Sequence, residues 1–283
     1  MKKGLILEGG GMRGLFTAGV IDVMMENDIV FDGAIGVSAG AAFGCNYKSK
    51  QVGRVLRYNV ENCKNPEYCS FRSLIKTGDM FGAEYCYHKL PEEIDVFDYN
   101  AYESNPMEFH VVCTDVESGK AIYKKCDEVN YETLEWIRAS ASMPLVSRIV
   151  EVGGYKMLDG GISDSIPLKY FESIGYDKNI VVLTQPEDYI KNENKLIPIM
   201  KLALKKYPAV VETMAKRHVI YNETTQYIKD KELKGEILVI RPDEALPIKR
   251  VEHDADVMRH AYGLGRVVAM RRLDEIKTFL KGE

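Results

Sequence analysis

The sequence predicts an α/β fold in three layers, with a mostly parallel central sheet covered by helices on both faces. Two observations point to this class. Strand-like and helix-like segments alternate from the start of the chain, which is the pattern of consecutive βα units. The short apolar runs, of which Ile180–Leu183 is typical, have the continuous hydrophobicity of strands that are buried on both sides.

Six segments have the length and apolar character of strands. They cover residues 4–7, 33–37, 108–116, 155–158, 178–183 and 237–240.

Helices are predicted between these strands from apolar residues at helical spacing. Residues 15–27 place Phe16, Val20, Val23 and Met24 on one face. Further helices are expected from residue 39 onward, over 131–142, over 167–174 with a proline in the first turn, and from 257 to the end of the chain.

Two stretches are less regular. Residues 48–105 carry scattered Asn, Tyr, Lys and Pro, and we expect them to leave the core and to cap a site. Residues 184–235 are expected to be helical and rich in lysine. No repeat, low-complexity segment or linker divides the chain, so we expect residues 1–283 to form a single domain.

The composition excludes several classes of protein. The 38 Lys and Arg are outnumbered by 42 Asp and Glu, so the net charge is −4 and no basic surplus indicates a nucleic-acid partner. No apolar run approaches the ~18–20 residues that cross a bilayer. The first apolar stretch stops at Glu8, too early for a signal peptide. We therefore expect a cytoplasmic protein.

The cysteines form no C-x-x-C pair, so we expect free thiols and no metal site. No Asp/Glu cluster suggests calcium, and no cofactor is expected. The six cysteines are Cys45, Cys63, Cys69, Cys86, Cys113 and Cys126.

A glycine-rich turn follows the first predicted strand, where residues 9–14 are G-G-G-M-R-G. Backbone N–H groups in such a turn, together with a helix N-terminus, form a concave anion site. The pattern also satisfies the dinucleotide motif G-x-G-x-x-G. That motif needs an acidic residue after the second strand, whereas Asp32 precedes it.

A serine motif follows the second predicted strand. Gly36, Ser38 and Gly40 form G-x-S-x-G between a strand and a helix, which is the setting of a nucleophile elbow. In a parallel sheet the loops after neighbouring strands open on the same edge, so the glycine turn can present N–H groups beside Ser38. This juxtaposition predicts a nucleophile facing an oxyanion hole.

The base that a serine nucleophile needs is predicted to be Asp159, which ends a strand and is followed by Gly160 and Gly161. Burial and loss of water on substrate binding would raise its basicity. None of the five histidines follows a strand in a glycine context. These are His88, His110, His218, His253 and His260.

These three motifs, in this order, resemble those of the patatin-like phospholipases, and the resemblance covers about residues 4–170 as a catalytic core. It implies a three-layer α/β/α fold and a Ser–Asp dyad that hydrolyses acyl esters of lipids, with Ser38 as nucleophile and Asp159 as base. The segment 138–144, with the sequence R-A-S-A-S-M-P, resembles the family's small-residue stretch near the dyad. Residues 171–283 match no motif, and we expect them to continue the sheet and its covering helices.

The resemblance also assigns the supporting residues. The oxyanion hole is expected from Gly9, Gly10, Gly11 and the amide of Met12, with Arg13 anchoring that loop. The remaining motif residues are Gly14, Gly36, Gly40, Gly160 and Gly161.

The expected function is a phospholipase A, lysophospholipase or esterase activity on a lipid or ester substrate. Two alternatives stay open: an acyltransferase of related layout with a histidine partner, and a non-enzymatic nucleotide-binding module that uses the glycine loop. The sequence leaves the oligomeric state undetermined.

Transient contact with a membrane surface is a further hypothesis, because a phospholipid substrate lies at an interface. Cations of the segment 191–217 and of the helix 257–281 could face anionic head groups, although solvated helix faces are the favoured explanation of these charges. Those of the helix are Arg266, Arg271, Arg272, Lys277 and Lys281.

Overall fold

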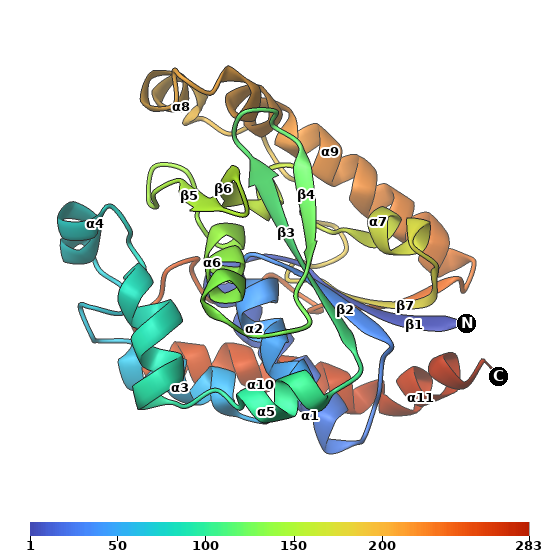
Figure 1. The fold of residues 1–283 in the computed structure, drawn as a ribbon. Coiled ribbons are helices and arrows are strands. Elements are labelled where there is room, and N and C mark those ends of the chain that lie inside the picture. The colour runs from blue at the N-terminus through green and yellow to red at the C-terminus, as the bar shows by residue number, and fades with distance from the viewer. Residues whose placement is uncertain (283) are drawn as a thin grey trace.

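A mixed sheet separates two layers of helices in the computed structural model, which describes residues 1–282 (Figure 1). The predicted three-layer α/β/α class is confirmed. The five parallel strands at its centre run in the order β3 (Glu108–Asp115), β2 (Gly33–Val37), β1 (Lys2–Leu7), β7 (Tyr176–Val182) and β8 (Ile237–Ile240). They are buried on both faces, which explains their continuous apolar sequences.

Three antiparallel strands complete the sheet around β3, and this local topology positions the site. β4 (Ala121–Lys125) pairs with one edge of β3 over residues 110–114. The other edge is shared: β2 pairs with it up to Val112, and β6 (Tyr155–Asp159) pairs with it from Cys113 onward. β5 (Val150–Val152) forms a hairpin with β6. β2 and β6 therefore approach each other end to end along one edge of β3.

Different helices cover the two faces of the sheet. One face of the sheet carries α1 (Gly14–Glu26), α2 (Ala39–Lys48), α6 (Tyr131–Ser140) and α10 (Ala255–Arg271), and the other carries α7 (Leu168–Ser173) and α9 (Pro208–Leu233). Helices α1 and α10 approach closely because of their glycines. A Cβ at Gly19 would lie 2.1 Å from the Tyr262 carbonyl oxygen, and one at Gly265 would lie 2.0 Å from that of Phe16.

The irregular segment 48–105 leaves the sheet and packs against α2. It contains α3 (Arg54–Asn62), α4 (Phe71–Thr77), the π-helix η2 (Tyr85–Ile94) and α5 (Tyr99–Ser104). Side chains of this segment join the hydrophobic core formed by α1 and α2. They also wall a cavity that reaches Ser38, so the segment covers this cavity.

Several elements differ from the sequence prediction. The short strands β4 and β5 were not predicted. Within the segment 184–235, the helices are α8 (Ile197–Ala203) and α9, and residues 183–196 contain none. The C-terminal helix is two helices, α10 and α11 (Leu273–Lys281), which meet at Arg272. None of the helices within residues 1–282 combines the length and apolarity required to span a bilayer.

Candidate active site

Ser38 occupies the turn between β2 and α2, where its backbone has φ 56° and ψ −122°. This conformation is unfavourable for a residue with a side chain, and such strain is typical of a nucleophile elbow. The flanking glycines make the turn sterically allowed. A Cβ at Gly36 would lie 2.3 Å from the Gly40 carbonyl oxygen, and one at Gly40 would lie 2.4 Å from that of Leu7. The motif thus adopts the strand–turn–helix geometry that the sequence predicts.

Asp159 reaches Ser38 because β2 and β6 share one edge of β3. Val37, the last residue of β2, pairs with Val112, and Asp159, the last residue of β6, pairs with Cys113. The two strands run in opposite directions, so their C-terminal ends face each other. Ser38 and Asp159 consequently line the same cavity, although they are 121 positions apart in the chain.

The segment 138–144 holds both residues in place. The Ser140 Oγ accepts a hydrogen bond from the Ser38 N–H at 2.8 Å and donates one to the Val112 carbonyl oxygen at 2.6 Å. The Ser142 carbonyl oxygen accepts the N–H of Asp159 at 2.8 Å. The small-residue stretch therefore connects the ends of β2 and β6 through direct hydrogen bonds.

The Asp159 carboxyl group is 5% exposed and has a raised pKa. Burial is the main cause, since it disfavours the charged form. The Ser38 hydroxyl, the Arg217 charge and the Gly161 N–H, which donates to Oδ1 at 2.7 Å, oppose this effect. An aspartate in this environment is a stronger proton acceptor than one in water.

The glycine loop lies directly against the serine turn. A Cβ at Gly9 would lie 2.8 Å from the Val37 carbonyl oxygen and 2.9 Å from the Ser38 Cβ. The N–H groups of Gly9, Gly10 and Gly11 donate to no acceptor within residues 1–282. The N–H of Met12, expected in the oxyanion hole, instead donates to the Arg250 carbonyl oxygen at 3.1 Å.

Gly14 and Gly160 lie where the chain packs too closely for a side chain, whereas Arg13 has a different role. A Cβ at Gly14 would lie 2.9 Å from that of Ala39, where α1 and α2 begin side by side, and one at Gly160 would lie 2.1 Å from the Val112 carbonyl oxygen. Arg13 was expected to anchor the glycine loop. Its Nε is instead buried without an acceptor among the described residues, and its side chain lines a cavity.

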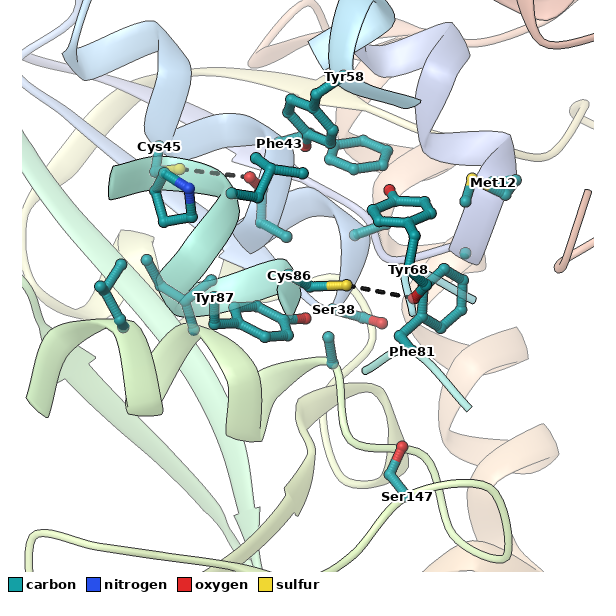
Figure 2. Close-up of a pocket in the computed structure, with 18 of the residues that line it drawn as sticks. Met12, Ser38, Phe43, Cys45, Tyr58, Tyr68, Phe81, Cys86, Tyr87 and Ser147 are labelled. Atoms are coloured by element: carbon teal, nitrogen blue, oxygen red, sulfur yellow. Dashed lines mark hydrogen bonds between the residues drawn. The ribbon is translucent and has the colours of Figure 1, made fainter. Parts of the chain in front are cut away.

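Two cavities meet at Ser38. The larger, of about 170 Å³, is lined mainly by apolar and aromatic side chains, several of them from the segment 48–105. Figure 2 shows Ser38 among Tyr58, Tyr68, Phe81 and Tyr87 in this cavity. The second, of about 40 Å³, contains Asp159 and the glycine loop. It also holds four cationic side chains. Sequence reasoning singled out Arg13 only as an anchor of the glycine loop and missed Lys191, Arg217 and Arg250 as site residues.

The histidines have other surroundings, and none lines either cavity. His88 contacts Glu135 at 3.2 Å and stacks on Tyr131, while His110 contacts Glu108 at 3.3 Å. His218 lies on α9, where its Nδ1 contacts the Ala215 carbonyl oxygen. His253 precedes α10 and its Nδ1 contacts the Cys63 carbonyl oxygen. His260 lies on α10 and is exposed.

The nucleotide alternative needs an acidic group near the glycine loop after β2. Asp32 instead lies just before β2, at the opposite end of the strand from Ser38, where its Oδ2 accepts the Lys3 N–H at 2.7 Å. It therefore cannot contact a ribose bound at the glycine loop.

Metal-ligating side chains are not clustered in the described part of the chain: no group of three or more His, Cys, Asp or Glu could hold an ion. The six cysteines are free thiols.

Comparison with known proteins places the chain in a family. Residues 5–172, more than half of the chain, match the model of the patatin-like phospholipases. The chain belongs to the patatin-like phospholipase family. Membership confirms the resemblance of the three motifs and supports lipid hydrolase activity at the level of the family. Residues 207–281 match a second model, described as a domain of unknown function, DUF6363.

Proteins of several bacteria are similar to this chain. It is 26% identical over 281 residues to the uncharacterized protein YjjU of Escherichia coli, covering 93% of this chain and 74% of that protein. It is 26% identical over 179 residues to an uncharacterized NTE family protein of Mycobacterium tuberculosis, covering 63% of this chain and 48% of the relative. Superposition on the crystal structure of VipD from Legionella pneumophila gives a TM-score of 0.46 at 13% identity, covering 97% and 67% of the two chains.

Proposed function

We propose that this protein is a serine acyl hydrolase that cleaves lipid esters with a Ser38–Asp159 dyad. The observation that carries the proposal is the end-to-end approach of β2 and β6 along β3, which brings the two side chains into one cavity. The strained turn at Ser38 and the raised pKa of the buried Asp159 support it.

In the first half of the reaction, Asp159 accepts the Ser38 proton while Oγ attacks the ester carbonyl carbon. The carbonyl oxygen becomes an oxyanion, and the N–H groups of Gly9, Gly10 and Gly11, which have no acceptor within residues 1–282 and belong to the loop against the serine turn, could stabilise it. Collapse of this intermediate breaks the ester C–O bond. The leaving alcohol takes the proton from Asp159, and an acyl-serine remains.

In the second half, Asp159 accepts a proton from water, whose oxygen attacks the acyl carbon. The second oxyanion collapses with cleavage of the bond to Ser38 Oγ, which recovers the proton. The products are a carboxylic acid and an alcohol, and the enzyme returns to its starting state.

The apolar cavity is suited to the acyl chain. It starts at Ser38 and is closed by the segment 48–105 through Tyr58, Tyr68 and Tyr87. Burial in such a cavity removes the chain from water and is favourable in proportion to the apolar area buried.

We further propose that residues 1–283 act as one domain. β7 and β8 extend the sheet beside β1, and Lys191, Met214 and Arg217, which follow residue 172, line the cavity of the dyad. The C-terminal part would then complete the site.

Membrane contact is proposed through α8. Leu196, which directly precedes α8, is 47% exposed, and Ile199 and Leu202 within the helix are 55% and 76% exposed. Lys201 on the same helix is exposed and makes no ion pair within residues 1–282. Exposed apolar residues beside free lysines are typical of an interfacial helix. The C-terminal helices suit this role less well, because several cations there are paired: Arg266 with Glu26, Arg271 with Asp243 and Arg272 with Glu275.

Hydrolysis of p-nitrophenyl octanoate tests the dyad. We expect Ser38→Ala and Asp159→Asn each to reduce kcat by at least about a thousandfold. His218→Ala, which changes the histidine on α9 outside both cavities, is the matched control and should retain activity. A fluorophosphonate probe should label wild type and not Ser38→Ala. Turnover by Ser38→Ala, or loss of turnover in His218→Ala, would contradict the proposal.

A further inference from the structure

The second cavity at the dyad is surrounded by cations from four separate parts of the chain. Arg13 belongs to the turn after β1, Lys191 precedes α8, Arg217 lies on α9 and Arg250 precedes α10. Three of the four follow residue 172, where the match to the patatin-like model ends. The C-terminal part of the chain thus gives this cavity its charge.

The charges of these four side chains are not neutralised by ion pairs. None of the four makes a salt bridge within residues 1–282, in contrast to Arg266 and Arg271 on the surface. The one nearby carboxylate besides Asp159 is that of Glu8, and its oxygens accept hydrogen bonds from the Thr184 N–H at 2.6 Å and the Tyr221 hydroxyl at 2.7 Å.

The donors are held in place while their charged ends stay available. Lys191 Nζ lies 4.0 Å from the centroid of the Tyr221 ring, which fixes the ammonium group by a cation–π contact. Arg217 donates through Nε to the Gly161 carbonyl oxygen. The Arg13 Nε is buried with no acceptor among the described residues. A buried guanidinium nitrogen without an acceptor is costly unless a ligand supplies one.

We propose that Arg13, Lys191, Arg217 and Arg250 form a subsite for the phosphate group of the substrate, so that this enzyme acts on phosphate-bearing lipid esters in preference to neutral glycerides. This inference rests on the proposed hydrolase function. Ser38 borders both cavities, so an ester bound there would place its acyl chain in the apolar cavity and its head group among the cations. In a glycerophospholipid, the glycerol unit alone separates the ester from the phosphate.

The electrostatics of the subsite agree with this assignment. Burial, followed by the charges of Arg217, Arg250 and Arg13, lowers the pKa of Lys191 to about 7, and Glu8 opposes the shift only in part. A phosphate dianion or monoanion among these groups would favour the charged ammonium form and complete the set of charge-assisted hydrogen bonds.

The kinetic test compares lysophosphatidate with a monoacylglycerol of the same chain length. We expect kcat/KM to be at least about tenfold higher for the phosphate-bearing substrate. Lys191→Met and Arg250→Met should each reduce that ratio by about tenfold. Arg217 is left unchanged because it also holds Gly161 beside Asp159. The control is Lys195→Met, which removes an exposed lysine from the same loop.

A binding test separates the subsite from the chemistry and identifies the source of the phosphate. Calorimetry on Ser38→Ala should detect lysophosphatidate binding that weakens about tenfold in Lys191→Met, with much weaker binding of glycerol 3-phosphate and inorganic phosphate. Equal preference for the two lipids, or inorganic phosphate binding more tightly than the lipid, overturns the head-group assignment while leaving p-nitrophenyl ester hydrolysis untouched. Lysine-dependent lipid binding without turnover of any ester would instead reject the hydrolase and retain the subsite.

Discussion

The Ser140 hydroxyl accepts the backbone N–H of Ser38 at 2.8 Å and thereby fixes the turn that presents the proposed nucleophile. The same hydroxyl donates to the Val112 carbonyl oxygen at 2.6 Å, at the point where β2 ends along β3. One fully buried side chain therefore connects the serine turn to the strand that Asp159 flanks.

Replacing Ser140 with alanine should lower kcat more than it raises KM. The Ser38 N–H would lose its acceptor and the strained turn would relax, so we expect kcat for p-nitrophenyl octanoate to fall by about tenfold to a hundredfold. Unsatisfied buried groups should also cost about 1–3 kcal/mol of stability. Ser173→Ala, which removes an exposed hydroxyl on α7, is the matched control. An unchanged kcat in a folded Ser140→Ala protein would show that the hydroxyl does not position Ser38.

The raised pKa of Asp159 predicts opposite effects of Asp159→Asn on activity and on stability. The folded state favours the protonated carboxyl group, so its stabilising contribution is present at low pH and is lost as pH rises through the raised pKa. At pH 7 the ionised, buried group is therefore a cost that asparagine removes. We expect a higher Tm for Asp159→Asn at pH 7, by about 2–4 °C for each kcal/mol gained.

The same shift should appear in the pH dependence of wild type. As the general base, Asp159 must be ionised, so kcat/KM should fall toward acid pH with an apparent pKa above the ordinary value of about 3.9. The difference in Tm between the two proteins should vanish below that pH. A Tm for Asp159→Asn that is lower than that of wild type at pH 7 would contradict this interpretation.

The sequence predicted that Asp159 lies at the C-terminal end of a strand, but it did not predict the direction of that strand in the sheet. We expected Asp159 at the end of a strand in a mostly parallel sheet, whereas β6 is antiparallel to β3 and its C-terminal end faces the C-terminal end of β2. β6 enters the sheet as the second strand of a hairpin with β5, and neither β5 nor the neighbouring β4 was predicted. β4 is half-exposed and β5 has three residues, so neither has the apolar run that identifies a buried strand.

The motif residues around Ser38 could be predicted because glycine and serine at fixed spacing are required by a local turn. The cations that line the second cavity could not be predicted in this way. Lys191, Arg217 and Arg250 belong to segments without a motif, and tertiary folding alone brings them beside Arg13. In the sequence, each of them is indistinguishable from a solvated surface charge.

Replacing Gly9 with alanine should abolish activity by displacing the serine turn. The new Cβ would lie 2.8 Å from the Val37 carbonyl oxygen and 2.9 Å from the Ser38 Cβ, so the backbone must shift. We expect kcat to fall by about a hundredfold or more, consistent with a misplaced nucleophile and oxyanion donor. Gly263→Ala in α10 is the matched control, since nothing lies within 4 Å of its Cβ position. That variant should keep full activity and gain up to about 1 kcal/mol of stability.

Filling the apolar cavity should shorten the acyl chains that the enzyme accepts. Cys45 lines the cavity on α2, seven residues after Ser38 and therefore about 10 Å along the helix. Cys45→Phe should lower kcat/KM for p-nitrophenyl palmitate by at least about tenfold and leave p-nitrophenyl butyrate within about twofold. The short ester also reports whether the variant is folded. Equal losses on both esters would argue against this cavity as the acyl site.

Membrane contact through α8 should depend on its exposed apolar residues. Ile199 and Leu202 are 55% and 76% exposed beside Lys201, so insertion of their side chains and attraction of the lysine to anionic lipid would act together. We expect Ile199→Asp/Leu202→Asp to reduce sedimentation with phosphatidylglycerol-containing vesicles by about tenfold, with p-nitrophenyl butyrate hydrolysis unaffected. Leu233→Asp changes an 87% exposed leucine at the far end of α9 and serves as the control. Vesicle binding that survives the double substitution, or that is lost equally in the control, would mean that α8 is not the contacting element.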